Sequence, residues 1–339
     1  MKNLTEKLIQ NKDLTSDEAT ELMTKIMDGE LSPAVIAAVL VALRMKGETT
    51  EEITAFAKVM RSKATPIPVK GDTIVDTCGT GGDASHSFNI STTVALLLSG
   101  GGYKVAKHGN RSMTSKSGSA DVLESLGVNL NLTPDQVAAC VDQTGIGFLF
   151  APALHSAMKN VMPVRKELGV RTIFNILGPL TNPAGANVQI LGLFDASLVG
   201  TLAHVLRDLG LARGFVVSGK SGFDEVAIHE NSLIAHIRGD GKIEEFEFDP
   251  EIFGYEKVAL EELRGGEASD NATITKDILS GNLKGPKRDV IALNAGFAIA
   301  ALDEIDLKAA FHKAEDLLTS GAGLKALESL VEVSNSFNG

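Results

Sequence analysis

A short β-type run enters a glycine-rich loop in the segment Thr73-Ile74-Val75-Asp76-Thr77-Cys78-Gly79-Thr80-Gly81-Gly82-Asp83. The polar stretch SFNISTT at residues 87–93 follows and leads into a predicted helix. A strand, a turn rich in glycine and a polar helix start are the building units of α/β folds with a mostly parallel sheet. The segment therefore predicts the class of fold and the place where a ligand is expected to bind.

Further β-type runs alternate with helical stretches along the rest of the chain, as in a mostly parallel central sheet. Besides Thr73–Val75, the β-type runs are Tyr103–Ala106, Gly147–Phe150, Val188–Leu191 and Gly214–Val217. The helices between them are predicted at Ser91–Leu98, Ala120–Leu126, Pro134–Gln143, Ala153–Leu168 and Ser197–Leu209. We expect a hairpin at Ser232–Ile237 and Ile243–Phe248, and closing helices at Pro286–Leu302 and Leu307–Thr319.

The first part of the chain has helical patterns only. A helix start is typical at Ser16, a nearly all-round apolar helix is predicted from Pro33 to Met45, and Thr49 or Thr50 begins another helix. The proline-rich segment at 64–68 is a stiff linker. We therefore predict an α/β protein with a small N-terminal all-helical domain, residues 1–70, and a larger α/β domain, residues 71–339, with a mostly parallel central sheet.

Composition excludes several classes of function. The 339 residues include 32 Lys and Arg against 43 Asp and Glu, a net charge of −11, which disfavours binding to nucleic acid or to an anionic membrane. The longest apolar run, Ala34–Leu43, is too short to span a bilayer. Two cysteines cannot make a disulfide framework and suit a reducing compartment. We expect a soluble cytoplasmic protein.

The glycine loop is interpreted as a phosphate site. Three glycines at positions 79–82 allow backbone N–H groups to converge on an anion, and the helix start beyond adds its dipole. Asn89, Ser91 and Thr92 supply neutral donors. The alternative is an ordinary tight turn with capping residues.

Two nucleotide-binding motifs are matched only formally. The string GTGGDA at 79–84 fits the dinucleotide fingerprint, but Lys107 stands near the position of the required acid, and Asp83 would repel a pyrophosphate unless it binds a sugar hydroxyl or a metal. Gly214–Ser221 fits the Walker A pattern, yet it contains a buried-strand run and no clear helix opens at Lys220. We set both interpretations aside.

A basic loop, KHGNRS at 107–112, is expected after the second strand, at the same sheet edge as the glycine loop. Two such loops would face one anionic ligand; the alternative is a solvated polar turn. Asp224-Glu225 follow a later strand and form a plausible Mg²⁺ seat, or a solvated pair. Arg165 or Arg171 could hold a carboxylate, or form a salt bridge instead.

These segments together resemble the anthranilate phosphoribosyltransferase family over essentially the whole chain. The strings DTCGTGGD at 76–83 and KHGNRS at 107–112 are shared with this family and with pyrimidine nucleoside phosphorylases, and Pro163-Val164-Arg165 with Asp224-Glu225 favours the transferase. The resemblance implies a segment near 162–183 that returns to the helical domain, a homodimer, Mg²⁺, and phosphoribosyl pyrophosphate and anthranilate as substrates in tryptophan biosynthesis. A phosphorylase-like enzyme and a non-catalytic nucleotide-binding protein are the alternatives.

The resemblance also implies site residues. Lys107, Asn110 and Arg165 would be catalytic, with Asn110 and Arg165 contacting anthranilate, and Ser91, Asp224 and Glu225 would bind metal. The implied substrate-binding residues are Gly79, Gly82, Asp83, Ser87, Asn89, Ile90, Ser91, Thr92, Lys107, His108, Gly109, Asn110, Arg111, Ser112, Met113, Thr114, Ser115, Ser119 and Arg165.

The implied reaction needs no strong base, because an aniline nitrogen is unprotonated at neutral pH. The amine attacks C1 of the ribose as pyrophosphate leaves, through an oxocarbenium-like transition state. We expect Mg²⁺, Lys107 and loop amides to stabilise the departing pyrophosphate. Cys78 is interpreted as a small buried residue and not as a nucleophile.

Overall fold

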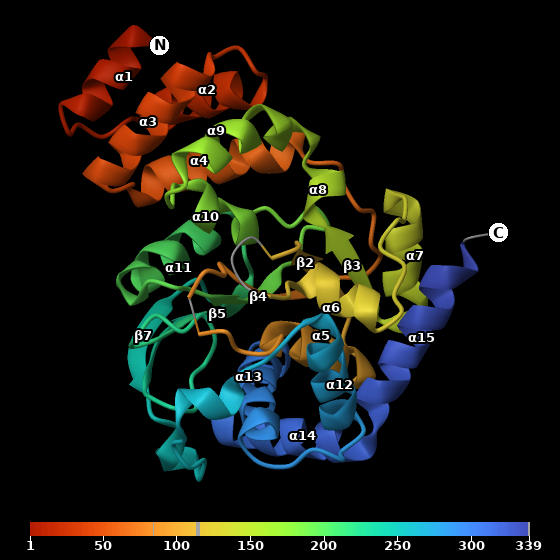
Figure 1. Cartoon of the computed structure of the whole chain (residues 1–339). Coiled ribbons are helices and arrows are strands. Elements are labelled where there is room, and N and C mark those ends of the chain that lie inside the picture. The colour runs from red at the N-terminus through yellow and green to blue at the C-terminus, as the bar shows by residue number, and fades with distance from the viewer. Residues whose placement is uncertain (84, 113–115, 338–339) are drawn as a thin grey trace.

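The chain forms a helical layer above a seven-stranded sheet whose opposite face is covered by further helices (Figure 1). The structure is a computed structural model that describes residues 1–83, 85–112 and 116–337. The helical layer contains α1 (Lys2–Ile9), α2 (Ser16–Met27), α3 (Pro33–Lys46) and α4 (Thr50–Lys63). Within the described residues no helix is both long and apolar enough to cross a membrane.

Local signals explain where the first helices begin. Thr15 and Glu18 form a capping box at the start of α2, and Thr49 and Glu52 form one at the start of α4. The carboxylate of Glu52 is fully buried, accepts the backbone N–H of Leu14 at 2.9 Å and lies 2.8 Å from Lys46 Nζ. One buried carboxylate thus ties α4 to α3 and to the segment before α2.

The sheet has the strand order β3-β2-β1-β4-β5-β6-β7. Neighbours from β3 to β5 are parallel, and β6 and β7 add an antiparallel hairpin at the positions predicted for it. The strands are β1 (Val75–Gly79), β2 (Val105–Gly109), β3 (Ile146–Phe150), β4 (Val188–Gly192), β5 (Arg213–Gly219), β6 (Ser232–Ile237) and β7 (Ile243–Phe248). The predicted fold class is confirmed. From β1 the sheet grows in one direction through β2 and β3, and from β4 it grows in the other direction through β5, β6 and β7. The boundary between β1 and β4 is therefore the switch point of the sheet. Ligands of parallel sheets bind beyond the carboxyl ends of the strands at such a point.

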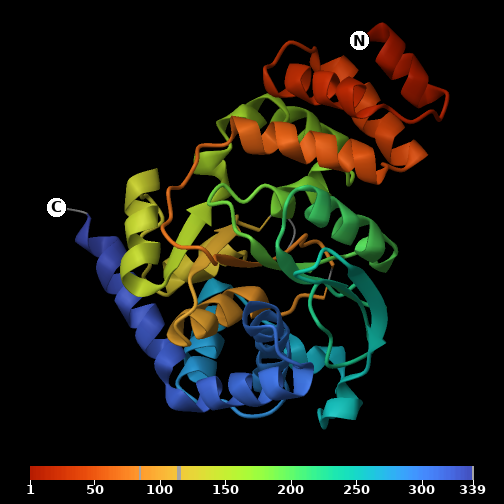
Figure 2. The same ribbon diagram turned by 180° about the vertical axis from the view of Figure 1, so that it is seen from behind.

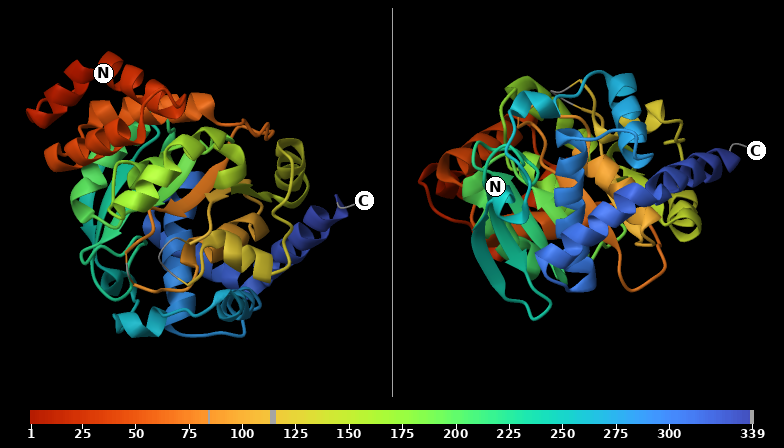
Figure 3. Two further views of the ribbon diagram at one scale, coloured as in Figure 1. Left: turned by 45° about the horizontal axis from the view of Figure 1, so that its top comes forward. Right: turned by 90° about the horizontal axis from the view of Figure 1, so that it is seen from below.

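The two faces of the sheet are covered by different helices. Along β5, Phe215 and Val217 enter a core with α5 and α13, whereas Val216 enters the core shared with the N-terminal helices and α11. Figure 3 shows α13, α14 and α15 beneath the sheet, and Figure 2 shows the β6–β7 edge opposite the C-terminal helix. The remaining helices are α5 (Ile90–Gly100), α6 (Ser119–Ser125), α7 (Pro134–Thr144), α8 (Ala151–Leu154), α9 (Met162–Leu168), α10 (Phe174–Leu177), α11 (Val199–Asp208), α12 (Ala268–Leu279), α13 (Pro286–Asp303), α14 (Leu307–Ser320) and α15 (Ala322–Ser336).

The segment after β3 returns to the helical layer (Figure 1). Val164 of α9 and Phe174 of α10 are buried in the same core as the N-terminal helices, and Asn160 Nδ2 donates to the Met27 carbonyl at 2.8 Å. This core continues onto one face of the sheet, so the domain division at residues 70 and 71 stays a prediction.

Two expectations about local structure were wrong, and several helices were not anticipated. The helix expected over Ala153–Leu168 is broken into α8, a 3₁₀ turn at Ser156–Asn160 and α9. Pro163 explains the second break, because proline suits the first turn of a helix and not its interior. Helices α1, α12 and α15 were not anticipated. The second strand extends to Gly109, so Lys107 and His108 belong to the strand and not to the loop.

Candidate functional site

The glycine loop lies at the switch point of the sheet. Gly79 at the end of β1 pairs in register with Gly192 at the end of β4. A Cβ atom on either glycine would clash with Asp224, which follows β5. Gly81, at φ 65°, donates its backbone N–H to Asp224 Oδ2 at 2.7 Å. The two glycines therefore let Asp224 approach both strand ends closely, with its carboxylate at Gly79 and its backbone at Gly192.

Asp83, Asp224 and Glu225 bring negative charge together at this edge. Burial, and next the charge of Asp83, raises the pKa of Asp224 to about 7; burial and the charge of Asp224 raise the pKa of Glu225 to about 8. Glu225 Oε1 accepts the backbone N–H of Ser91 at 3.0 Å. Asp83 Oδ2 is buried and has no hydrogen-bond partner among the described residues. Such a cluster favours a bound cation.

Lys107 extends from β2 beneath the glycine loop. Its side chain is 2% exposed, and Nζ donates to the Thr77 carbonyl at 2.6 Å and lies 3.3 Å from Ser91 Oγ. Burial lowers the pKa of Lys107, and the charge of buried Asp76 opposes that shift. A cavity of about 10 Å³, near the size of one water, is lined by Thr77, Ser91 and Glu225 among others. Gly81 is thus hydrogen-bonded to Asp224, whereas Lys107 and Glu225 both lie within hydrogen-bond distance of Ser91. Gly81, Lys107 and Glu225 therefore meet at one edge of the sheet.

The N-terminus of α5 faces the same edge. Thr77 Oγ1 donates to the Ser91 carbonyl at 2.9 Å, which fixes the helix start against β1. Asn89 Nδ2 donates to the Ser117 carbonyl at 3.2 Å. The side chains of Ile90 and Thr92 are each 1% exposed, so Ile90 packs in the core. Ser87 forms an isolated β-bridge with Arg264 instead of belonging to the helix.

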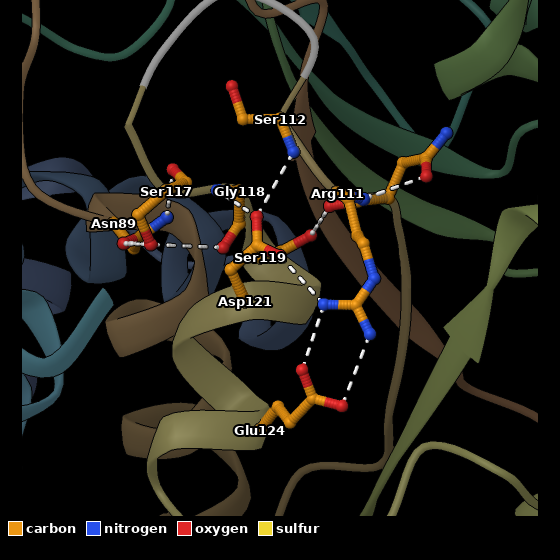
Figure 4. A network of polar contacts seen from close by, with 9 residues as sticks. Asn89, Arg111, Ser112, Ser117, Gly118, Ser119, Asp121 and Glu124 are labelled. Carbon is orange, nitrogen blue, oxygen red and sulfur yellow. Dashed lines mark hydrogen bonds and ion pairs between the residues drawn. The ribbon is translucent and has the colours of Figure 1, made fainter. Parts of the chain in front are cut away.

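Arg111 is committed to protein partners (Figure 4). Its guanidinium forms two hydrogen bonds with Glu124, at 2.8 and 3.1 Å, and one with Asp121 at 2.8 Å. The backbone N–H of Ser112 is donated to Asp121, and the Ser119 hydroxyl to the Asn110 carbonyl. Among the residues predicted from the resemblance, Met113, Thr114 and Ser115 lie outside the described part of the chain.

The two candidate arginines have different surroundings. Arg165 is half-buried, lies 5.7 Å from the Phe174 ring centroid and has no acidic partner among the described residues. Burial lowers its pKa, although an arginine stays charged. Arg171 donates to the Gly82 carbonyl, lies 4.0 Å over the Phe194 ring, and its own carbonyl accepts from Arg44 of α3. Neither arginine pairs with an acidic side chain among the described residues; Arg171 donates to a backbone carbonyl, whereas Arg165 has no hydrogen bond to an oxygen there.

His108 and His155 form a buried pair, with their Nε2 atoms 3.2 Å apart. Burial, and next the charge of His155, lowers the pKa of His108 to about 3. His108 is consequently neutral at physiological pH, which agrees with its interpretation as a structural hydrogen-bonding group.

Replacing His108 by Gln is expected to weaken the acid sensitivity of folding. Because the folded-state pKa lies below the unfolded value of 6.5, its contribution is fully present above pH 6.5 and is lost as pH falls toward about 3. Between pH 7 and pH 5 the native protein should lose roughly 2 kcal/mol more than the variant. Urea unfolding at both pH values measures the difference, and parallel losses in the two proteins contradict it.

Cys78 lies within β1 and is buried. Gln189 Nε2 donates toward its sulfur at 3.1 Å, and burial raises the thiol pKa well above its ordinary value. A thiol held protonated is a poor nucleophile. The structure supports the structural role expected for it.

Several polar residues near the site carried no predicted role. Asp76 is fully buried and accepts from the His108 backbone at 3.2 Å and from Asn182 Nδ2 at 2.8 Å. Asn271 of α12 is 2% exposed and donates to Asn89 Oδ1 at 2.9 Å. An aspartate inside an apolar run was a usable signal for Asp76, whereas Asn271 gave none because α12 was not anticipated.

Comparison with known proteins first defines the class. The glycosyl transferase family a/b domain matches residues 71–324, and the glycosyl transferase family helical bundle domain matches residues 2–64. The chain is thus a glycosyltransferase built from a helical bundle and an α/β domain.

Individual relatives define the family. Anthranilate phosphoribosyltransferase from Geotalea uraniireducens is 49% identical over 97% of this chain and 98% of its own length. The enzyme of that name from Symbiobacterium thermophilum is 49% identical over 98% of this chain and 97% of its own length. The crystal structure of anthranilate phosphoribosyltransferase from Thermus thermophilus aligns with a TM-score of 0.92 at 42% identity, covering 98% of this chain and 99% of that one. The chain belongs to the anthranilate phosphoribosyltransferase family, and the resemblance drawn from its motifs is confirmed.

A more distant relative has a solved complex. Anthranilate phosphoribosyltransferase from Saccharomyces cerevisiae in complex with PRPP and Mg aligns with a TM-score of 0.90 at 29% identity, covering 98% of this chain and 97% of that chain. The same yeast enzyme has been solved in complex with 4-fluoroanthranilate, with a TM-score of 0.88 at 28% identity over 98% of this chain and 97% of that one.

Proposed function

We propose that this protein transfers the phosphoribosyl group of 5-phosphoribosyl 1-pyrophosphate to the amine of anthranilate. The products are N-(5-phosphoribosyl)anthranilate and pyrophosphate, in tryptophan biosynthesis. One observation carries the proposal: the glycine loop, the start of α5, Lys107 and the Asp224-Glu225 pair meet at the switch point of the sheet. That arrangement suits a ligand with several negative charges and a cation.

The donor side of the proposed site is the loop and helix start around β1. Gly79, Gly82 and Asp83 would lie along the phosphoribosyl donor, and Asn89 and Ser91 would hold its phosphates at the helix N-terminus. The helix dipole favours anions there, although the Ser91 backbone N–H is already accepted by Glu225. Lys107 adds a positive charge from below, buried where a charge interacts more strongly than in water.

The residues present fit Mg²⁺. Asp224 and Glu225 repel one another and Asp83, and a divalent cation would relieve that repulsion. Within the described residues no three His, Cys, Asp or Glu side chains are grouped closely enough to hold an ion alone. Mg²⁺ commonly takes one or two carboxylates and completes its shell with water and substrate phosphates. We assign Asp224, Glu225 and Ser91 to its binding, where Mg²⁺ would neutralise charge on the pyrophosphate.

The acceptor side is assigned to Asn110 and Arg165. Arg165 lacks an acidic partner among the described residues, and its planar fork matches a carboxylate such as that of anthranilate. Asn110 lies at the end of β2, directly after the strand that carries Lys107. The protein's contribution is then to hold the amine near C1 of the ribose and to present Lys107 and loop amides to the leaving group.

Replacing Arg165 by Ala is expected to raise the KM for anthranilate by about tenfold to a hundredfold, because a charge-assisted pair with the carboxylate is lost. The KM for the donor should change little. Arg171→Ala is the matched comparison, and since Arg171 contacts Gly82 it should affect the donor instead. Steady-state kinetics with each substrate varied separates the two. An unchanged KM for anthranilate removes Arg165 from this role.

The activity is tested by the fluorescence change on phosphoribosylanthranilate formation, with Mg²⁺ and after its removal by a chelator. Turnover that needs both substrates and Mg²⁺ supports the proposal. Phosphorolysis of a pyrimidine nucleoside with inorganic phosphate would instead identify a phosphorylase. Binding of the donor without release of pyrophosphate in the presence of anthranilate would identify a binding protein.

We also propose that two copies associate through the helical layer. Met45 is 83% exposed and Ile9 63% exposed, and Val41 adds a third exposed apolar side chain on α1 and α3. Helices α1 and α3 pack against each other, and large exposed apolar side chains on adjacent helices favour an interface. Light scattering should give twice the mass of one chain, and Met45→Glu should shift the mass toward that of one chain.

A cytoplasmic location is proposed on the state of the cysteines. Cys78 and Cys140 are both buried and unpaired, which suits reducing conditions. Fractionation of cells that produce the protein tests the location.

A further inference from the structure

One carboxylate joins two backbone segments beside the proposed donor site (Figure 4). Asp121, in the first turn of α6, accepts the backbone N–H of Gly118 at 2.8 Å and that of Ser112 at 3.2 Å, both on Oδ2. Its other oxygen, Oδ1, accepts from Arg111 at 2.8 Å. The same side chain therefore holds the end of β2 and the start of α6 together.

The two segments lie close enough to need a glycine. A Cβ on Gly118 would clash with the backbone of Ser112 and approach the Asn110 carbonyl to 2.7 Å. The Asn110 carbonyl also accepts the Ser119 hydroxyl and the Ala120 backbone N–H, each at 3.2 Å. Bonds from both sides thus fix the position of the α6 start.

The segment fixed in this way reaches the start of α5. The Ser117 carbonyl accepts Asn89 Nδ2 at 3.2 Å, and the Ser117 hydroxyl lies 3.4 Å from Asn89 Oδ1. Asn89 is assigned above to the donor phosphates, and we assign Ser119, a substrate-binding residue by the resemblance, to the same ligand; neither has a hydrogen bond to Asp121 among those described. A change at Asp121 would therefore be felt where the phosphates bind.

We propose that Asp121 is a positioning residue of the donor site, which keeps the β2 end and the α6 start in the spacing that places Ser119 and Asn89. This inference rests on the proposed function. Arg111, expected from the resemblance to touch substrate, is part of the same assembly: its guanidinium extends toward Asp121 and Glu124. Burial acts to raise the pKa of Asp121, but hydrogen bonds from Gly118 and Arg111 outweigh it and lower that pKa.

Asp121→Asn is the informative change because its amide cannot satisfy both sides. With oxygen toward Gly118 and Ser112, the NH₂ group faces Arg111; turned over, the NH₂ group faces the two backbone donors. Glu124→Gln is the matched control, since Glu124 shares the Arg111 contact but has no hydrogen bond to Gly118 or Ser112 among those described. Comparison of the two variants separates the effect of the hydrogen bonds to the Gly118 and Ser112 backbone from the effect of the ion pair with Arg111.

The test measures kinetics with phosphoribosyl pyrophosphate varied at saturating anthranilate, together with thermal unfolding. We expect Asp121→Asn to raise the donor KM by about tenfold or more, as lost charge-assisted hydrogen bonds predict, and Glu124→Gln to stay within about twofold of the native protein. An Asp121→Asn protein with the native donor KM overturns the inference. So does an equal effect of Glu124→Gln.

A second variant covers failure of the first to fold. Gly118→Ala forces the same segments apart and leaves the carboxylate intact, so it should raise the donor KM in the same direction; a folded Gly118→Ala protein with the native KM overturns the inference. If the native protein itself shows no turnover, the proposed function is refuted. If the native protein turns over and both variants have the same donor KM as the native protein, only the role of Asp121 is refuted.

Discussion

Lys107→Met is expected to lower kcat/KM for the phosphoribosyl donor by about a hundredfold to a thousandfold, the range seen when a preorganised group that stabilises developing charge is removed. The ammonium of Lys107 is buried and fixed between the Thr77 carbonyl and Ser91 Oγ. It therefore needs no reorganisation when charge develops on the leaving pyrophosphate. Most of the loss should appear in kcat, which steady-state assays under saturating donor measure directly.

The same change affects folding, and that effect must be separated. Without Lys107 the buried Thr77 carbonyl loses its donor, at a cost of about 1–3 kcal/mol, and Asp76 loses the nearby positive charge. Thermal unfolding shows whether the variant is folded at the assay temperature. Lys104→Met, on the same chain segment but at the surface, is the control and should keep full activity. A folded Lys107→Met protein with native kcat contradicts the assigned role.

Asp224→Asn is expected to raise the stability of the metal-free protein and to raise the concentration of Mg²⁺ that activity requires. The asparagine oxygen can still accept the Gly81 N–H, so the loop geometry is retained. Removing one charge relieves repulsion with Asp83 and Glu225, and the metal-free variant should unfold at a higher temperature than the native protein near pH 8. The concentration of Mg²⁺ that gives half-maximal activity should rise by about tenfold to a hundredfold or more.

Titration of activity with Mg²⁺ and scanning calorimetry in a chelator provide the two measurements. Asp240→Asn, in the exposed turn of the β6–β7 hairpin, is the control for loss of one surface carboxylate. An unchanged Mg²⁺ requirement in Asp224→Asn would remove this residue from the metal site. Lower stability in the metal-free variant would contradict the account of repulsion.

The fold was largely predictable because its signals are local. Alternation of β-type runs and helical stretches predicted the sheet, and the hairpin at Ser232–Phe248 was placed correctly because polar turn residues separate two short runs. The helix starts at Ser16 and at Thr49 or Thr50 were predictable from such local signals, although the residue that caps α2 is Thr15 and not Ser16. The break within Ala153–Leu168 was missed because the apolar spacing continues across it.

The candidate site was predictable in its residue types but less so in its contacts. Neighbouring loops of a parallel sheet meet at one edge, and this rule placed the glycine loop, Lys107 and Asp224-Glu225 together. The partners of Arg111 depend on the orientation of α6, and those of Asn89 on α12, which lies far along the chain. Contacts of that kind depend on tertiary packing, and no local pattern encodes them.

The close approach of Asp224 to two strand ends has a consequence for how this sequence can diverge. Gly79 and Gly192 are separated by more than a hundred positions, yet each leaves room for the same aspartate. A side chain at Gly79 would meet the Asp224 carboxylate and one at Gly192 the Asp224 backbone, so a substitution at either glycine would displace Asp224. We therefore expect a substitution at Gly79 or Gly192 to be neutral only if the turn that carries Asp224 and Glu225 changes in the same step.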